Sequence, residues 1–166
     1  MATTAGNDPA GSPARPPVDR GAVWVWTQSV LMAAVVAAGP VWPGTWHHHF
    51  ALTVGGLLFA AAGALGIAGV VQLGANRTPF PRPRDGSRLI ENGVYAYVRH
   101  PLYVSVILAS LGWALLFQSG PALVLALILL PFFDAKARRE ERWLREMFPS
   151  YVDYARRVKR FVPGVY

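Results

Sequence analysis

The sequence predicts an all-α, polytopic membrane protein with about four transmembrane helices, the last two forming a helical hairpin, and a helical C-terminal tail. Apolar residues make up 53% of the 166 residues and charged residues only 15%, against roughly 25% charged residues in an average soluble domain. The apolar residues also fall into long uncharged runs separated by polar segments. A soluble chain of this length cannot bury so much apolar surface, whereas lipid accommodates it.

Residues 1–20, rich in Pro, Gly, Ala and Ser, are expected to form a disordered tail, and residues 21–166 a single membrane domain. A cleaved signal peptide is the alternative for the first apolar run, and a re-entrant hairpin is the alternative for the last two, which are shorter than the ~20 residues of a full crossing. The expected crossings are residues 22–41, 50–73, 102–117 and 121–133.

Breaks in these runs follow from proline and glycine. Pro40, Pro43 and Gly44 should end the first helix, and Pro131 should kink the last crossing. Residues 74–100 are expected to form an extended polar loop. Residues 134–160 have an apolar stripe at helical spacing, which Pro149 interrupts, so two C-terminal helices with a bend are expected.

The net charge of +7 is concentrated at the ends of the apolar runs, which favours contact with anionic membrane lipids and not with nucleic acid. The first and third connections contain no Lys or Arg, so the charged segments share one side of the membrane. The positive-inside rule makes that side the cytoplasm. Both termini and the polar site are therefore expected on the cytoplasmic side of the cell membrane.

The sequence gives little indication of a metal site or a nucleotide-binding site. The chain has no cysteine, so disulfides and thiolate ligands are excluded. The run His47–His49 could suggest a metal site, but consecutive helical residues point in different directions and no carboxylate lies nearby. An exposed loop is favoured there, and no metal is expected. Phosphate-binding glycine motifs and a G-x-S-x-G motif are also missing from the sequence.

Two polar clusters flank the last hairpin, at residues 93–103 and 136–144, and the hairpin should return both to one membrane face. Arg99 and His100 offer donors for a carboxylate, while Glu140 and Glu141 suit a cation. Together with nearby tyrosines, this inventory matches a ligand that has a cation, a carboxylate and an aromatic base. The alternatives are headgroup anchoring by the first cluster and a solvated helix face in the second.

The pattern G-V-Y-x-x-x-R-H-P-x-Y at Gly93–Tyr103 resembles the signature of the isoprenylcysteine carboxyl methyltransferase family, which belongs with the phospholipid N-methyltransferases. The second half of that signature is similar to Glu140-Glu141-x-x-Leu144 and the following aromatic residues, and the resemblance covers about residues 70–163. It implies methyl transfer from S-adenosylmethionine on a helical membrane fold. The resemblance implies these cofactor-binding residues: Tyr95, His100, Pro101, Leu102, Tyr103, Glu140, Leu89 and Ile90.

The catalytic candidates are Arg99, Glu141 and Lys136, of which Lys136 occupies a position where the family has a basic residue facing the substrate. The expected function is an isoprenylcysteine carboxyl O-methyltransferase-like enzyme whose lipophilic acceptor enters from the bilayer. The alternatives are methylation of a phospholipid amine, in which Glu141 or a tyrosine would accept a proton, and methylation of a small thiol or other small molecule. A membrane scaffold or lipid-binding protein without catalysis is a further alternative. No feature of the sequence indicates an oligomeric state.

Overall fold

The computed structural model describes residues 21–45, 49–76, 78, 80 and 86–166. The expected disordered tail, residues 1–20, and two of the three consecutive histidines lie outside this part. The described residues are all-helical, and an isolated bridge between Val98 and Lys159 is their only strand-like pairing. The α-helices are α1 (Ala22–Val41), α2 (His49–Leu73), α3 (Pro101–Leu116), α4 (Gly120–Met147) and α5 (Tyr151–Arg157), and the short 3-10 helices are η1 (Gly74–Asn76) and η2 (Gly93–Ala96).

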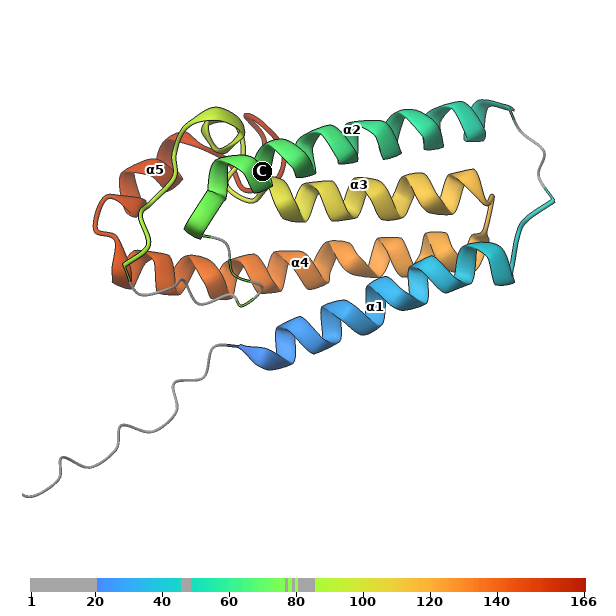
Figure 1. The fold of residues 1–166 in the computed structure, drawn as a ribbon, viewed down its shortest axis with the longest axis horizontal. Helices are drawn as coiled ribbons and strands as arrows, with labels where there is room; N and C mark the ends of the chain where they lie inside the picture. Colours follow the sequence, from blue (N-terminus) through green and yellow to red (C-terminus); the bar gives the residue numbers. More distant parts are fainter. Residues whose placement is uncertain (1–20, 46–48, 77, 79, 81–85) are drawn as a thin grey trace, which may run out of the picture.

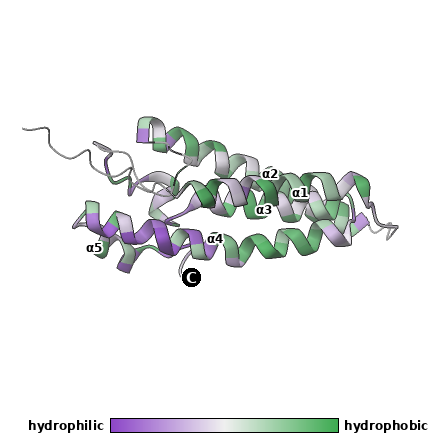
Figure 2. Cartoon of the chain, turned by 90° about the horizontal axis from the view of Figure 1, so that it is seen from below, coloured by the Kyte–Doolittle hydropathy of each residue, from purple (hydrophilic) through white to green (hydrophobic). Residues whose placement is uncertain are grey.

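The four long helices run along the longest axis of the molecule, with α3 between α2 and α4 (Figure 1). Since successive long helices run in opposite directions, the end of α2, the start of α3 and the end of α4 meet at the same end. There α5 and the C-terminal segment join them (Figure 1). Hydrophilic residues concentrate at this end, which we call the polar end (Figure 2).

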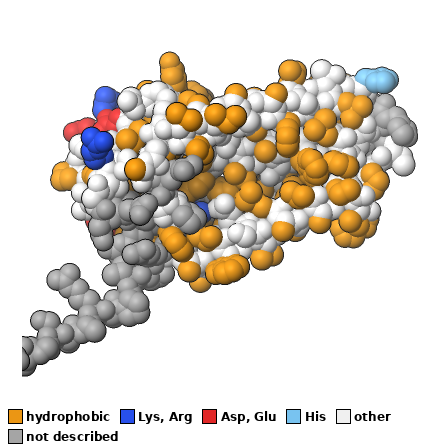
Figure 3. Space-filling model, viewed as in Figure 1, with side chains coloured by type: hydrophobic (Ala, Val, Ile, Leu, Met, Phe, Trp, Pro, Cys, Tyr) orange, Lys and Arg blue, Asp and Glu red, His pale blue; other side chains and the backbone are white. Residues whose placement is uncertain are grey.

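The outer surface of the long helices is apolar, as expected for contact with lipid. Phe50 and Ile67 on α2 are 80% and 68% exposed. Apolar side chains cover this face of the molecule, whereas Lys, Arg, Asp and Glu gather at the polar end (Figure 3). Among the described residues, three helices, at Ala22–Val41, His49–Asn76 and Gly120–Met147, are long and apolar enough to cross a membrane. The expected third crossing is the shorter helix α3, whose 16 residues span about 24 Å.

The first helix extends past Pro40 to Val41, so the expected break begins only after that residue. Proline has no N–H to donate to the carbonyl four residues earlier, which here belongs to Val36. This carbonyl accepts a 3.2 Å hydrogen bond from the indole Nε1 of Trp113 on α3. Because a side chain from another helix replaces the missing backbone donor, the proline fits inside α1.

The last crossing continues as one unbroken helix, α4, through Pro131 and into the charged sequence up to Met147. The helix thus continues 14 residues beyond residue 133, the expected end of the crossing itself. Ser119 caps the start of α4 by accepting a hydrogen bond from the N–H of Ala122. The apolar residues 120–133 lie along the other long helices, and the charged half from Asp134 onward extends into the polar end. Pro149 lies between α4 and α5.

Small residues let α2 and α3 approach closely. A Cβ atom on Gly112 would lie 2.8 Å from the carbonyl oxygen of Gly55 and 2.9 Å from the nitrogen of Phe59. Close approach through glycine is a common way of packing helices in lipid. By contrast, Gly56 and Gly63 on α2 have nothing within 4 Å of such a Cβ. The contact between α2 and α3 sets the spacing of the elements that meet at the polar end.

Candidate functional site

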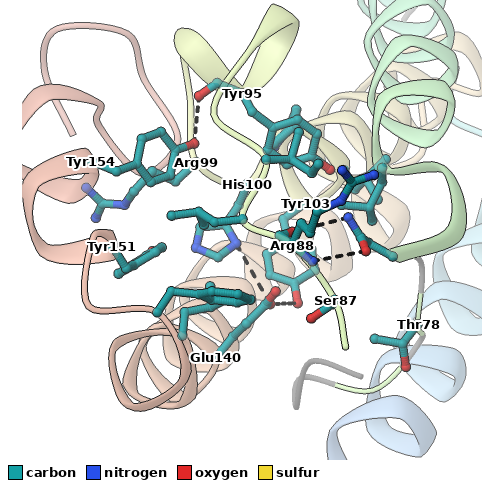
Figure 4. Close-up of a pocket in the computed structure, with 18 of the residues that line it drawn as sticks. Thr78, Ser87, Arg88, Tyr95, Arg99, His100, Tyr103, Glu140, Tyr151 and Tyr154 are labelled. Atoms are coloured by element: carbon teal, nitrogen blue, oxygen red, sulfur yellow. Dashed lines mark hydrogen bonds and ion pairs between the residues drawn. The ribbon is translucent and has the colours of Figure 1, made fainter. Parts of the chain in front are cut away.

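A cavity of about 140 Å³ lies at the polar end, between the end of α2, the start of α3, the charged half of α4 and α5 (Figure 4). Its walls mix aromatic rings, aliphatic side chains and a few charged groups. The lining residues are Leu73, Asn76, Thr78, Phe80, Ser87, Arg88, Leu89, Ile90, Tyr95, Arg99, His100, Pro101, Leu102, Tyr103, Glu140, Leu144, Phe148, Tyr151 and Tyr154.

The structure brings together most of the residues that the sequence singled out. All eight expected cofactor-binding residues line this cavity, and so does Arg99. The other two catalytic candidates, Glu141 and Lys136, are buried beside the cavity and do not line it. Residues from both halves of the signature thus share one site, although one half lies at the start of α3 and the other lies in the charged half of α4.

Glu140 places a carboxylate on the cavity wall. Its Oε2 accepts a 2.5 Å hydrogen bond from the hydroxyl of Tyr103 and lies 3.8 Å from Nδ1 of His100. The rings of His100 and Tyr103 stack in parallel, with centroids 5.2 Å apart (Figure 4). This packing fixes the rotamers around the carboxylate, so the negative charge has a defined position.

Glu141, the next residue, is fully buried beside the cavity and surrounded by basic side chains. Arg99 Nη2 lies 2.9 Å and His100 Nε2 3.2 Å from its Oε1. Two further guanidinium groups, those of Arg160 and Arg145, also bind the carboxylate. Burial by itself would raise the pKa of Glu141, but hydrogen bonds from His100 and Arg160, and the charges of His100 and Arg99, outweigh burial and hold this pKa well below its ordinary value.

Arg99 connects this buried carboxylate to α5. Its Nη1 donates to the carbonyl oxygens of Ala155, at 2.8 Å, and Val158, at 2.6 Å, which belong to the last turn of α5 and the residue that ends it. A cation is favourable at a helix C-terminus because the carbonyl groups there are unpaired. In Figure 4 the Arg99 guanidinium points toward the α5 side of the cavity, between Tyr151 and Tyr154. Arg99 therefore fastens α5 against the start of α3.

Lys136 lies one helical turn before Glu140 and is only 2% exposed. Its Nζ donates to Oε1 of Gln28 on α1 and lies 5.1 Å from the centre of the Tyr103 ring. Tyr103 thus separates the ammonium group from the cavity. Gln28 was not singled out from the sequence, because an isolated Gln in an apolar run has no distinguishing pattern.

The side chain of Asn76 places the loop before α3 over the cavity. Asn76 Nδ2 donates to the carbonyl of Arg88, and Arg88 N–H donates to Asn76 Oδ1, at 3.2 Å and 3.3 Å. Gly93 lies in the left-handed region, with φ 58°, and a Cβ there would collide with Gln72, whose Oε1 accepts the N–H of Val94. These contacts hold the loop and η2, and with them Tyr95, against α2.

The hydroxyl of Tyr151 has no hydrogen-bond partner within the described part of the chain, although the residue is 1% exposed and lines the cavity. The neighbouring Tyr154 is satisfied, because its hydroxyl donates to the carbonyl of Tyr95 at 2.6 Å. An unpaired buried hydroxyl is unfavourable unless a bound molecule or water forms a hydrogen bond with it. From sequence alone, Tyr151 was one member of the apolar stripe in the tail.

The family model for phospholipid methyltransferases matches residues 50–150. The cobalt-zinc-cadmium resistance protein CzcN of Cupriavidus metallidurans is 33% identical over 144 residues, which cover 85% of this chain and 62% of that protein. Protein-S-isoprenylcysteine O-methyltransferase of Schizosaccharomyces pombe is 36% identical over 77 residues, covering 45% of this chain and 33% of that protein.

A similar arrangement of helices occurs in the solved structure of a eukaryotic intramembrane Ras methyltransferase, an isoprenylcysteine carboxyl methyltransferase. The TM-score is 0.67 at 20% identity, over 90% of this chain and 55% of that chain. The matched part of this chain therefore covers less than two thirds of the length of each of these relatives. The family model covers more than half of the chain, which therefore belongs to the phospholipid methyltransferase family, with isoprenylcysteine methyltransferases among its relatives.

Proposed function

We propose that this protein is an S-adenosylmethionine-dependent methyltransferase of the membrane, similar to isoprenylcysteine carboxyl O-methyltransferases, which methylates a lipophilic acceptor. The observation that supports this most is the cavity at the polar end. It combines the Glu140 carboxylate, an unpaired Tyr151 hydroxyl and a ring of aromatic and aliphatic side chains. The names of the relatives support the same reaction class, because several are methyltransferases.

The side chains of the cavity fit the chemical groups of S-adenosylmethionine. Glu140 suits its positively charged groups, and Tyr151 has a hydroxyl free to pair with a polar group of the ligand. Leu89, Leu144 and Phe148 provide an apolar surface for an aromatic base. When bound, this cofactor supplies the methyl group that is attached to its sulfonium sulfur. After the transfer, the rest of the cofactor leaves as a neutral thioether.

The chain's own residues would act by position and by exclusion of water. The stacked His100 and Tyr103 rings hold Glu140 in place, and the aromatic wall would help to keep water away from the reacting centre. Because all Lys and Arg of the described part lie toward the polar end, we propose that this end faces the cytoplasm. The acceptor would then enter from the bilayer and the cofactor from the cytoplasm.

The surroundings of Glu141 favour an acceptor that needs no general base. This carboxylate is bound by three guanidinium groups and His100, and its low pKa makes it a poor proton acceptor. A carboxylate acceptor is already ionised near neutral pH, because carboxyl pKa values lie around 4. We therefore propose a carboxylate in preference to an amine, with Glu141 as a positioning residue for Arg99 and His100.

Titration calorimetry of the purified full chain in detergent tests this function. Wild-type protein should bind S-adenosylmethionine, and Glu140→Gln should bind it at least about tenfold more weakly, because a charge-assisted contact of about 1.5–3 kcal/mol is lost. Glu146→Gln is the matched control, since Glu146 is an exposed carboxylate on the same helix that does not line the cavity. Equal affinities of the two variants would contradict the proposal.

A further inference from the structure

A second cavity, of about 420 Å³, opens between α3, α4 and the C-terminal segment. It shares no lining residue with the cavity at the polar end. Most of its wall is aliphatic or aromatic, and Leu130 and Val162 on the wall are 41% and 49% exposed. We call it the lateral groove; its lining residues are Val104, Ile107, Leu108, Leu130, Pro131, Asp134, Phe161, Val162 and Tyr166.

One end of the lateral groove is polar. The hydroxyl of Tyr166 donates to Oδ1 of Asp134 at 2.8 Å. Arg138 donates from Nε to Asp134 Oδ2, at 2.6 Å, and from Nη2 to the Tyr166 hydroxyl, at 2.8 Å. Arg160 donates from Nη1 to Asp134 Oδ1 at 2.7 Å. Two guanidinium groups therefore face the Asp134 carboxylate, and one of them, that of Arg160, is also bound to Glu141.

Within the described part of the chain, some hydrogen-bond donors of Arg138 have no partner. A guanidinium has five N–H groups, and the contacts with Asp134 and Tyr166 involve only Nε and Nη2. The Arg138 side chain is 58% exposed, so its free edge is accessible from outside. Arg160, by contrast, is 12% exposed and is held by Asp134 and Glu141. Arg138 is thus the residue at this end that is able to bind another anion.

We propose that the lateral groove binds an anionic phospholipid, with an acyl chain along its apolar wall and the phosphate at Arg138. The apolar wall belongs to the part of α3 and α4 that runs through the hydrocarbon, and Arg138 follows the end of the apolar run of α4. An apolar wall that ends at an arginine matches a phospholipid, in which an acyl chain ends at an anionic headgroup. Arginine is well suited to phosphate, which accepts two parallel hydrogen bonds from the guanidinium.

This lipid would be bound without being methylated, since the groove and the cavity at the polar end have no wall in common. It would stabilise the C-terminal segment, because the same Arg160 that binds Asp134 also binds the buried Glu141. The proposal therefore adds a structural lipid site to the proposed enzyme and requires only that the lipid in this groove is not the acceptor.

Native mass spectrometry of the purified full chain tests the proposal, with phosphatidylglycerol and phosphatidylcholine as probes. Wild-type protein should retain phosphatidylglycerol preferentially. Arg138→Gln should bind it about tenfold more weakly, as expected for loss of one charge-assisted contact. Arg139→Gln is the matched control, because Arg138 is bound to the lining residues Asp134 and Tyr166, whereas Arg139 lies over the ring of Trp143, which does not line the groove. Leu130→Trp, which fills the groove, should also reduce phosphatidylglycerol binding.

Binding of S-adenosylmethionine is measured in parallel, so that loss of the fold or failure of the proposed function is distinguished from loss of the lipid site. We expect the groove variants to retain cofactor affinity. Equal retention of the two lipids by wild-type protein, or equal phosphatidylglycerol binding by Arg138→Gln and Arg139→Gln, would overturn the proposal. Transfer of labelled methyl from the cofactor to the retained lipid would overturn it as well, because the lipid would then be a substrate.

Discussion

Arg160 binds Glu141 through two hydrogen bonds, 3.0 Å from Nε to Oε1 and 3.1 Å from Nη2 to Oε2. The pair joins the C-terminal segment to α4 directly under the cavity. Backbone contacts reinforce it, because the N–H of His100 donates to the carbonyl of Arg160 at 3.2 Å. The cavity wall formed by the start of α3 is thus held from below by the last residues of the chain.

Replacing Glu141 by Gln should destabilise the protein by roughly 3–5 kcal/mol, because Arg99 would remain nearly buried without its counterion and Arg160 would keep only Asp134. Thermal unfolding of the purified protein in detergent measures this effect. Glu146→Gln, which removes an exposed carboxylate from the same helix, should unfold close to the wild-type temperature. If the two variants unfolded together, the buried ion cluster would not stabilise the fold.

The same carboxylate predicts a pH dependence. The pKa of Glu141 is lower in the folded protein than in the unfolded chain, so its stabilisation is complete above the unfolded value of about 4.3 and is lost as the pH falls toward the folded value. The difference in unfolding temperature between wild type and Glu141→Gln should therefore be largest near pH 7 and shrink below about pH 4. A difference that grows on acidification would contradict this account.

The Gln28 side chain should affect methyl transfer to the acceptor and not the affinity for the cofactor. Gln28→Leu removes the hydrogen-bond acceptor of the buried Lys136 ammonium, while neither residue lines the cavity. Lys136 occupies the position that the family resemblance assigns to a basic residue facing the substrate, so we expect methyl transfer to fall with cofactor affinity unchanged. The unsatisfied buried ammonium should also lower the stability of the protein by roughly 1–3 kcal/mol or more. Ser29→Ala is the control, because Ser29 Oγ donates only within its own helix, to Val25. Loss of cofactor binding in Gln28→Leu would show that the two effects are not separate.

The close contact of α2 and α3 predicts opposite outcomes for two glycines. Gly112→Ala would place a Cβ 2.8 Å from the Gly55 carbonyl, so the helices would have to separate, at a cost of about 1–3 kcal/mol. Gly63→Ala meets open space and should be neutral or stabilising by up to about 1 kcal/mol, owing to the higher helix propensity of Ala. Chemical denaturation in detergent compares them, and similar effects of both would contradict the packing described here.

Much of the architecture could be predicted from the sequence because lipid imposes simple rules. Long uncharged runs predict membrane helices, and a hairpin between Arg99 and Glu140 necessarily returns both to one end. The cavity residues between Tyr95 and Tyr103 could also be predicted from the sequence, since they belong to one short stretch with a recognisable signature. Local patterns and topology were sufficient in these cases.

Features that depend on distant partners could not be predicted. The donor that accommodates Pro40 is Trp113, far along the chain on another helix. The burial of Glu141 depends on Arg160, and the position of Lys136 depends on Gln28, which is 108 residues away. Such pairs leave no periodic pattern in a single sequence, so only the folded structure reveals them.

The central claim is that α3 and α4 together form one S-adenosylmethionine site, and a double-mutant cycle at Tyr103 and Glu140 tests it most directly. Calorimetric affinities for the cofactor are compared among wild type, Tyr103→Phe, Glu140→Gln and the double variant. Since Tyr103 donates its hydroxyl to Glu140, we predict that the double variant binds no more weakly than the weaker single variant. Unchanged affinity in all variants, or losses that simply add, would contradict a shared site.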